Sequence, residues 1–310
     1  MTLSPVLLQR TLLFLLVEFF AAEAAATFSI AACDTKTGHC GVAVATHNLA
    51  VGNGVPFAVF NLGAGVSQFE TNPCHAPAAL AQLKRTGDAE QGLIAALNRE
   101  PDCPDGFDRH FRQIAIVAIN GSIAAHTGTN AGKFAGQKSQ KYVSVQGNGL
   151  SSVAVLDAML SHYQHAEGSL PEKLLGALEA GPIAGGQDIG TLSAALRVAT
   201  GEGWPVDTDL RVDFAPGDAI EHLRVQYDAA HARQLIHQAQ RTQSTEQQLA
   251  LVEHALKRAP QWDRIWLAAA RLAAANGDPK RAGERYCQFL ALNAVWAQLL
   301  NVEWDFSTCR

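Results

Sequence analysis

Ala24-Ala25-Ala26-Thr27-Phe28-Ser29-Ile30-Ala31-Ala32-Cys33 joins the end of a hydrophobic leader to the start of a strand pattern, which begins at Thr27. The leader carries one cation, Arg10, before an apolar run from Leu12 to Phe20 that only Glu18 interrupts. This run is shorter than the roughly 20 residues that a membrane-spanning helix needs. Small residues follow it, as they do before a signal-peptidase site. We therefore expect residues 1–26 to be a signal peptide that is removed after Ala26.

Two alternatives to this cleavage stay open at the level of sequence. The triplet Ala22-Glu23-Ala24 also fits the rule for a cleavage site, and an uncut leader would act as an anchor or an amphipathic helix. Only the cut after Ala26 gives a mature chain that begins with Thr27. Its hydroxyl would then be a nucleophile, and its α-amine, with an unperturbed pKa of roughly 7.7–8.0, would be the base. In an uncut chain the same nitrogen is an amide and cannot accept a proton.

Charge and patterning exclude several classes of function. The 310 residues carry a formal net charge of −5 without a basic stripe, so neither nucleic acid nor an anionic membrane is an expected partner. No second long apolar segment follows the leader, which predicts no stable membrane span after cleavage. Gly63-Ala64-Gly65 precedes a strand pattern and is interpreted as a turn, so we expect no nucleotide and no other cofactor. The expected location is exported, either periplasmic or extracellular.

Six cysteines follow the leader, and an even number in an exported chain indicates disulfides. The first two flank a predicted hairpin turn, the next two bracket a predicted helix, and the last two belong to the C-terminal helical region. The expected pairs are Cys33–Cys40, Cys74–Cys103 and Cys287–Cys309. No two cysteines have the C-x2-C spacing of a zinc site, so no metal is expected.

Hydrophobic patterning predicts strands first, then helices, then strands again, and finally a helical tail. The expected strands are 27–33, 41–47, 56–61, 63–68, 113–120, 122–127, 142–146, 192–199 and 209–214. The expected helices are 76–99 with a break at Gly87-Asp88, 151–164, 171–180 and everything after 218. Strands that do not alternate with helices favour a layered α+β fold with two antiparallel sheets. We expect a main domain at 27–240 and a helical extension at 241–310.

The helical extension contains a weak repeat. Ala255-Leu256 with Pro260 is echoed 34 residues later by Phe289-Leu290 with Ala294, and 34 is the period of tetratricopeptide repeats. One interpretation is a groove that binds a peptide partner. The favoured one is a set of helices that caps the main domain, because fewer than three repeats rarely fold alone.

The first hairpin gives a register. If Cys33 opposes Cys40, then Thr27 opposes Thr46, and His47 and Asn48 lie just beyond the strand end beside the new N-terminus. A slip of one residue would exchange these neighbours. The alternative for His47 is an ordinary loop histidine.

A series of short motifs occurs in order between residue 27 and about residue 225. They are Thr27-Phe28-Ser29-Ile30, Gly41-Val42-Ala43-Val44-Ala45, Ala50-Val51-Gly52, Thr71-Asn72-Pro73, His126-Thr127-Gly128, Gln146-Gly147-Asn148, Gly185-Gly186, Ser193-Ala194-Ala195-Leu196 and Asp209-Leu210-Arg211-Val212-Asp213. Together they resemble the DUF1028 family, a group placed among the N-terminal-nucleophile (Ntn) hydrolases. The resemblance implies a four-layer αββα sandwich and an amide-bond hydrolase whose nucleophile is an N-terminal threonine.

Some positions depart from the family pattern. Where the family often has Asp and Arg after the double glycine, and Gln before Ser-Ala-Ala, this chain has Gln187, Ile189 and Leu192. If the family's Arg binds substrate carboxylates, this chain has lost that contact or has changed substrate.

The expected catalytic residues are Thr27, Asn148 as an oxyanion donor and Asp188 as a group that orients the α-amine. The expected binding residues are His47, Asn48, Asn72, His126 and Ser193. Structural alternatives stay open: a helix cap for Asn148, a turn for Asn72, a core histidine for His126 and a plain loop position for Asp188.

Two function hypotheses follow. The first is an exported N-terminal-threonine hydrolase that cleaves an amide or related acyl bond in a small molecule or peptide. The second is a non-catalytic exported scaffold that uses the sandwich and the helical tail to bind a peptide or envelope partner. The sequence leaves the substrate open, and also whether the chain forms a homo-oligomer.

Overall fold

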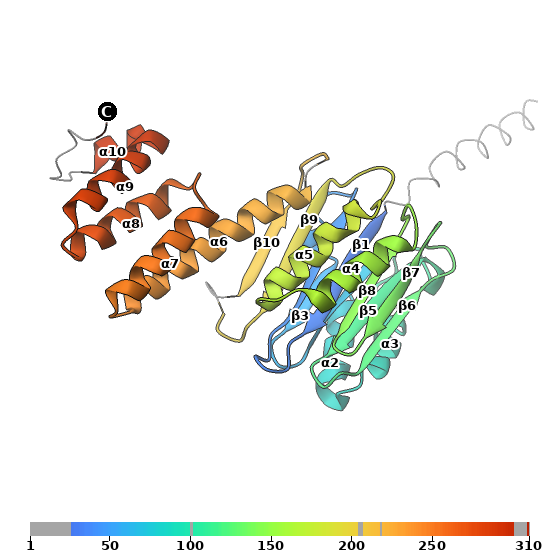
Figure 1. The fold of residues 1–310 in the computed structure, drawn as a ribbon. Coiled ribbons are helices and arrows are strands. Elements are labelled where there is room, and N and C mark those ends of the chain that lie inside the picture. The colour runs from blue at the N-terminus through green and yellow to red at the C-terminus, as the bar shows by residue number, and fades with distance from the viewer. Residues whose placement is uncertain (1–25, 100–101, 204–206, 218, 301–308, 310) are drawn as a thin grey trace, which may run out of the picture. The chain divides into compact units, whose positions relative to one another are not determined.

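Figure 1 shows the computed structural model, which describes residues 26–99, 102–203, 207–217, 219–300 and 309. All of the expected signal peptide except Ala26 lies outside the described residues. The chain divides into two compact units, one up to Leu223 and one from Arg224. This division falls inside a continuous helix, α6 (Ala219–Arg241), whereas the sequence pattern suggested a boundary at 240.

A six-stranded antiparallel sheet carries the N-terminal strand near its centre. Its order is β10-β9-β2-β1-β8-β7. The bounds are β1 (Thr27–Cys33), β2 (Cys40–Thr46), β7 (Gly136–Gln140), β8 (Val143–Asn148), β9 (Ser193–Ala199) and β10 (Thr208–Val212). The predicted hairpin register is confirmed, since Thr27 pairs with Thr46 and Cys33 with Cys40. On its other side, Thr27 pairs with Asn148 of β8.

A second antiparallel sheet faces the first. Its strands, in spatial order, are β3 (Pro56–Val59), β4 (Gly63–Phe69), β5 (Arg112–Ala118) and β6 (Ile123–Thr127). Because side chains alternate along a strand, each strand contributes one face to the space between the sheets. Val42 and Val44 of the first sheet pack there with Val66 and Val117 of the second.

Helices cover the outer face of each sheet (Figure 1). On the second sheet, α2 (His75–Thr86) and α3 (Ala89–Leu97) bury Leu83 and Leu93 against Ile114 and Ile116. On the first, α4 (Ala154–His165) and α5 (Leu170–Ile183) pack over the face that carries Phe28. The expected break between α2 and α3 is present, because Gly87 takes a left-handed conformation with φ 69°. The α+β class with antiparallel sheets is confirmed.

The second unit is helical, as expected. Beyond α6 it contains α7 (Thr245–Arg258), α8 (Asp263–Ala275), α9 (Pro279–Leu292) and α10 (Ala294–Leu299). Leu256 of α7 packs with Ile265 of α8, and Phe289 of α9 packs with Leu267 of α8. Across the part of the chain that the structure describes, no helix is both long and apolar enough to cross a membrane.

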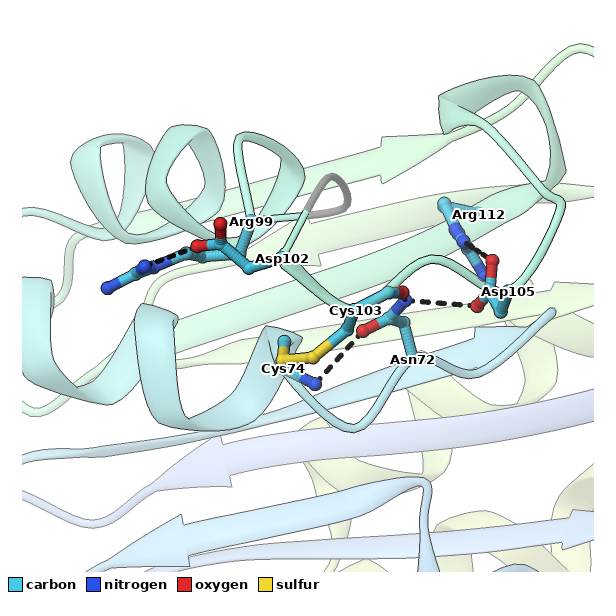
Figure 2. The surroundings of a disulfide bond; sticks show 7 residues. All are labelled: Asn72, Cys74, Arg99, Asp102, Cys103, Asp105 and Arg112. Carbon is cyan, nitrogen blue, oxygen red and sulfur yellow. Dashed lines mark hydrogen bonds and ion pairs between the residues drawn. A yellow bond between two sulfur atoms is a disulfide. The ribbon is translucent and has the colours of Figure 1, made fainter.

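The structure contains the three expected disulfides, Cys33–Cys40, Cys74–Cys103 and Cys287–Cys309. The second links the start of α2 to the loop that precedes β5 (Figure 2). Every cysteine of the chain is therefore paired.

Loss of the Cys74–Cys103 disulfide should destabilise the first unit substantially. The two cysteines are 29 residues apart, and the loop-entropy relation assigns roughly 3–4 kcal/mol to a crosslink of that span. We expect Cys74→Ala/Cys103→Ala to lower the Tm of this unit by roughly 10 °C in calorimetry. Cys287→Ala/Cys309→Ala is the matched control, because it acts on the second unit. An unchanged transition in the first double variant would contradict this expectation.

Candidate active site

Thr27 opens the central strand and is 4% exposed. Alternation places its side chain, like that of Ser29, on the face of β1 that meets the second sheet. Its Oγ1 lies 2.9 Å from Oγ1 of Thr46, its partner on β2. Its nitrogen donates to Oδ1 of Asn148, its partner on β8, at 3.2 Å. Both reactive atoms of Thr27 thus contact residues that the strand register places beside it.

The Thr46 hydroxyl has a defined direction. It donates its only proton to the carbonyl oxygen of Ala26 at 2.9 Å, so it must accept in its hydrogen bond with Thr27. The backbone N–H of Asn48 also donates to Thr46 Oγ1, at 3.3 Å. While Ala26 is attached, the Thr27 hydroxyl therefore donates to a neutral oxygen rather than to a base.

The carbonyl of Ala26 has two donors. Besides Thr46 Oγ1, the backbone nitrogen of His47 donates to it at 3.3 Å. Ala26 itself is buried and packs closely on Gly149, where an added Cβ would lie 2.8 Å from Ala26 Cβ. Removal of Ala26 would take away the acceptor of two donors beside Thr27, the Thr46 hydroxyl and the backbone N–H of His47.

A buried network between the sheets fixes the orientation of Asn148. Nε2 of Gln113 donates to the carbonyl oxygens of Gly136 and Gly147 at 3.2 and 2.9 Å, and a carbonyl oxygen can only accept. The other end of this amide must therefore be its oxygen. That oxygen accepts from Nδ2 of Asn148 at 2.9 Å and from Nε2 of Gln68 at 2.7 Å. Asn148 consequently turns its own oxygen toward Thr27.

The same network continues away from Thr27 along the interface of the sheets. Oε1 of Gln68 accepts from the Ser29 hydroxyl at 2.6 Å, and Ser29 Oγ accepts from Nε2 of Gln146 at 2.6 Å. Gln146 Oε1 then accepts from Ser144 at 3.0 Å. These side chains are all fully buried, so the network is rigid and each amide has one allowed direction.

This geometry changes the role expected for Asn148. A side-chain oxygen at 3.2 Å from the Thr27 nitrogen orients that nitrogen and cannot donate to an oxyanion there. The sequence had assigned the orienting role to Asp188. Asp188 is exposed, and its side chain has no hydrogen bond with a described residue.

A cavity of about 280 Å³ adjoins Thr27 and Thr46. Its other walls come from the segment after β2 and from the end of β4. The remaining lining residues are Asn48, Leu49, Ala50, Val51, Asn53, Gly54, Val55, Phe69 and Thr71. Of the two residues expected just beyond β2, Asn48 lines the cavity. His47 is exposed, and its backbone N–H donates to the Ala26 carbonyl.

Ser193 holds the cavity wall in place. It is fully buried at the start of β9, where it pairs with Thr46. Its hydroxyl donates to the carbonyl of Asn48 at 2.6 Å and accepts from the backbone nitrogen of Val51 at 3.1 Å. The structure thus gives Ser193 a positioning role, one layer behind the cavity surface.

Asn72 and His126, two residues expected to bind a ligand, form hydrogen bonds with the backbone of neighbouring segments. Asn72 accepts from the nitrogen of Cys74 at 2.9 Å and donates to the carbonyl of Cys103 and to Asp105 at 2.9 and 3.0 Å (Figure 2). Nε2 of His126 lies 2.8 Å from the carbonyl oxygen of Arg109. Asn72 therefore makes the contacts of a turn residue, whereas His126 is half-buried and bonded to the backbone rather than placed in the core.

An ion pair between a buried arginine and an aspartate nearer the surface completes the surroundings of Asn72 (Figure 2). The fully buried Arg112 side chain donates to Asp105 at 2.6 Å. This hydrogen bond is the main cause that lowers the pKa of Asp105 to about 2. Asp105 is therefore ionised throughout the neutral range.

The loop between α5 and β9 crosses the end of β1. The carbonyl of Gly186 accepts from the nitrogen of Ser151, just after β8, and the nitrogen of Leu192 donates to the carbonyl of Thr46, at the end of β2. Gln187 lies in this loop and is 6% exposed, yet neither atom of its side-chain amide has a partner among the described residues. A buried polar group without a partner costs stability.

Replacing Gln187 by an apolar residue of similar size should therefore stabilise the protein. We expect Gln187→Met to raise the unfolding free energy by about 1 kcal/mol, which corresponds to a Tm increase of roughly 2–4 °C. Gln113→Met, the same change at a fully paired buried amide, should lower the Tm. Thermal unfolding of both variants checks the contrast, and a lower Tm for Gln187→Met would refute it.

Comparison with known proteins assigns the family. Residues 27–223 match the family described as "Family of unknown function (DUF1028)". The chain belongs to the DUF1028 family. A solved DUF1028 structure, protein SPO2555 from Silicibacter pomeroyi, is similar at 29% identity and a TM-score of 0.59. The alignment covers 66% of this chain and 89% of that one. No match was found among curated proteins. The DUF1028 match begins at Thr27, the first residue of the central strand.

Proposed function

We propose that the mature protein is an exported Ntn hydrolase that uses Thr27 to cleave an amide or related acyl bond. The observation that carries this proposal is the environment of Thr27 at the head of β1. The Thr27 nitrogen donates to the amide oxygen of Asn148, whose orientation the buried network fixes. The Thr27 hydroxyl is hydrogen-bonded to Thr46, and a cavity opens beside both groups. The start of the family match at Thr27 supports a mature N-terminus at this residue.

Further features agree with the proposal. Two facing antiparallel sheets with helices on both outer faces support the αββα sandwich of Ntn hydrolases. Three disulfides and the apolar leader support export to the periplasm or the exterior. The two motifs that are 34 residues apart, Ala255-Leu256 and Phe289-Leu290, fall on α7 and α9, which supports a tetratricopeptide-like tail.

The proposed reaction starts from a chain whose first residue is Thr27. The free α-amine donates an N–H to Oδ1 of Asn148, which leaves its lone pair to face the Thr27 hydroxyl. The amine removes the hydroxyl proton while Oγ1 bonds to the acyl carbon. The Thr46 hydroxyl and the His47 N–H, which hold the Ala26 carbonyl in the uncut chain, are the proposed oxyanion donors.

The second half of the reaction completes the balance. The α-ammonium returns its proton to the leaving nitrogen as the C–N bond breaks, and the acyl group remains as an ester on Thr27 Oγ1. A water molecule, deprotonated by the same amine, then attacks the ester. The bond between the acyl carbon and Thr27 Oγ1 breaks, the α-ammonium returns the water's proton to Oγ1, and the acid product leaves with the hydroxyl and the amine restored.

Trapping of the ester tests this mechanism. The exported protein is mixed with a p-nitrophenyl acyl ester, quenched in acid and digested, and the N-terminal peptide is weighed with and without neutral hydroxylamine. We expect one acyl group on the peptide that begins at Thr27, and we expect hydroxylamine to remove it, as it removes esters but not amides. A label that resists hydroxylamine, or that sits on other peptides, would refute an ester at Thr27.

A further inference from the structure

No side chain that lines the cavity beside Thr27 is ionisable. Its eleven lining residues are all uncharged, and none of them is histidine. The apolar side comes from Leu49, Ala50, Val51, Val55 and Phe69. The polar side chains are threonine hydroxyls and asparagine amides, which carry no net charge.

Arg211 lies behind the cavity wall and is already paired. The aliphatic stem of Arg211 packs behind Gly52, where an added Cβ would lie 2.8 Å from Arg211 Cγ. Its guanidinium pairs with Asp209 at 2.8 Å. Glu70 sits between two lining residues but does not itself line the cavity. A charged substrate group in the cavity would therefore lose water without gaining an ionic partner, which is costly.

Two walls of the cavity are built in unusual backbone conformations. Ala50 and Phe69 have φ of 52° and 69°, in the left-handed region that residues with a side chain rarely adopt. Such conformations are unfavourable and persist where the surrounding structure holds them. Here Ser193 fixes the Asn48–Val51 segment, and the Phe69 ring stacks on Phe111 with centroids 6.5 Å apart. The shape of the cavity is therefore set before a ligand binds.

We propose that this cavity is the specificity pocket of the enzyme and that it selects a short, uncharged aliphatic group next to the scissile amide. The inference rests on the proposed function, because it takes Thr27 as the attacking residue. Selection follows from the walls: apolar side chains favour an aliphatic chain, and no lining side chain offers a counter-charge to a carboxylate or an ammonium, while the Thr27 α-amine is neutral in the reacting enzyme.

Three p-nitroanilides of similar acyl length test the selection. They carry butyryl, β-alanyl or succinyl groups, so the far end is a methyl, an ammonium or a carboxylate. We expect kcat/KM for the butyryl compound to exceed that for either charged compound by at least about tenfold. Equal rates for all three would overturn the pocket assignment while leaving the hydrolase intact.

Binding to Thr27→Ala separates the pocket from the reaction. Calorimetry with the three compounds should again give the butyryl compound the lowest Kd by at least about tenfold. Selective binding by this variant, with no turnover by the unmodified protein, would support the pocket assignment and refute the proposed hydrolase activity. No binding of any compound, or equal binding of all three, would overturn the pocket.

A charge placed in the wall should change the preference. Thr71 is half-buried at the edge of the cavity and donates to the carbonyl of Ser67 at 3.0 Å. We expect Thr71→Lys to reverse the order in favour of the succinyl compound. Thr71→Val is the matched control, because it loses the same hydrogen bond without adding charge and should keep the butyryl preference. A Thr71→Lys protein that still prefers the butyryl compound would contradict the proposal.

Discussion

Thr27→Ala is expected to abolish hydrolysis, with a loss in kcat of at least about 10³-fold, while the protein stays folded. The substitution removes the oxygen that attacks the acyl carbon and keeps the α-amine and the small N-terminal side chain. Its structural cost includes the hydrogen bond to Thr46, which is worth roughly 1 kcal/mol. Steady-state hydrolysis and thermal unfolding of the purified, processed variant measure the two effects separately.

Two matched variants sharpen this result. Thr27→Ser keeps a hydroxyl and an α-amine at the same position, so measurable turnover should remain. Thr46→Val removes one of the two proposed oxyanion donors while sparing the nucleophile, and a loss of about 10²–10³-fold in kcat is expected. If Thr27→Ala retained full activity, Thr27 could not be the nucleophile.

Asn148→Asp is expected to move the acidic limb of the pH–rate profile to higher pH by about 1–3 units. A carboxylate 3.2 Å from the Thr27 nitrogen favours the charged α-ammonium, which raises the amine pKa above its ordinary range of roughly 7.7–8.0. Since the reaction needs the neutral amine, activity near pH 7 falls and recovers as the pH rises above the new pKa. The measurement is kcat/KM against pH for the variant and the unmodified protein.

Gln146→Glu is the control for this shift. It places the same change in the same buried network, bonded to Ser29 rather than to Thr27. We expect it to lower stability but to leave the position of the acidic limb unchanged. Equal shifts in both variants would mean that Asn148 does not orient the α-amine.

The sequence predicted the part of the site that follows from local pattern. The spacing of Cys33 and Cys40 defined a hairpin register, and that register placed Thr46 opposite Thr27 before any tertiary structure was known. Strands and helices with apolar periodicity were also found, including the break at Gly87. These features depend on residues close together in the chain.

Features that depend on distant segments were missed. Gln68 and Gln113 interrupt apolar strands, and nothing in the sequence shows that they meet Asn148 between two sheets. The direction of the Asn148 amide follows from backbone carbonyls that only the folded chain brings together. Strand β7 was missed because it is a polar edge strand, with no apolar alternation to reveal it.

The proposed mature chain begins at Thr27 with a free amine, and the first experiment is the intact mass of the exported protein. It combines mass spectrometry, with and without reduction, with identification of the first residue. We expect a chain that starts at Thr27 and is about 6 Da lighter than its reduced form, for three disulfides. A chain that starts at Ala25 or earlier would keep the Thr27 nitrogen in a peptide bond, and Thr27 could then not act as an N-terminal nucleophile.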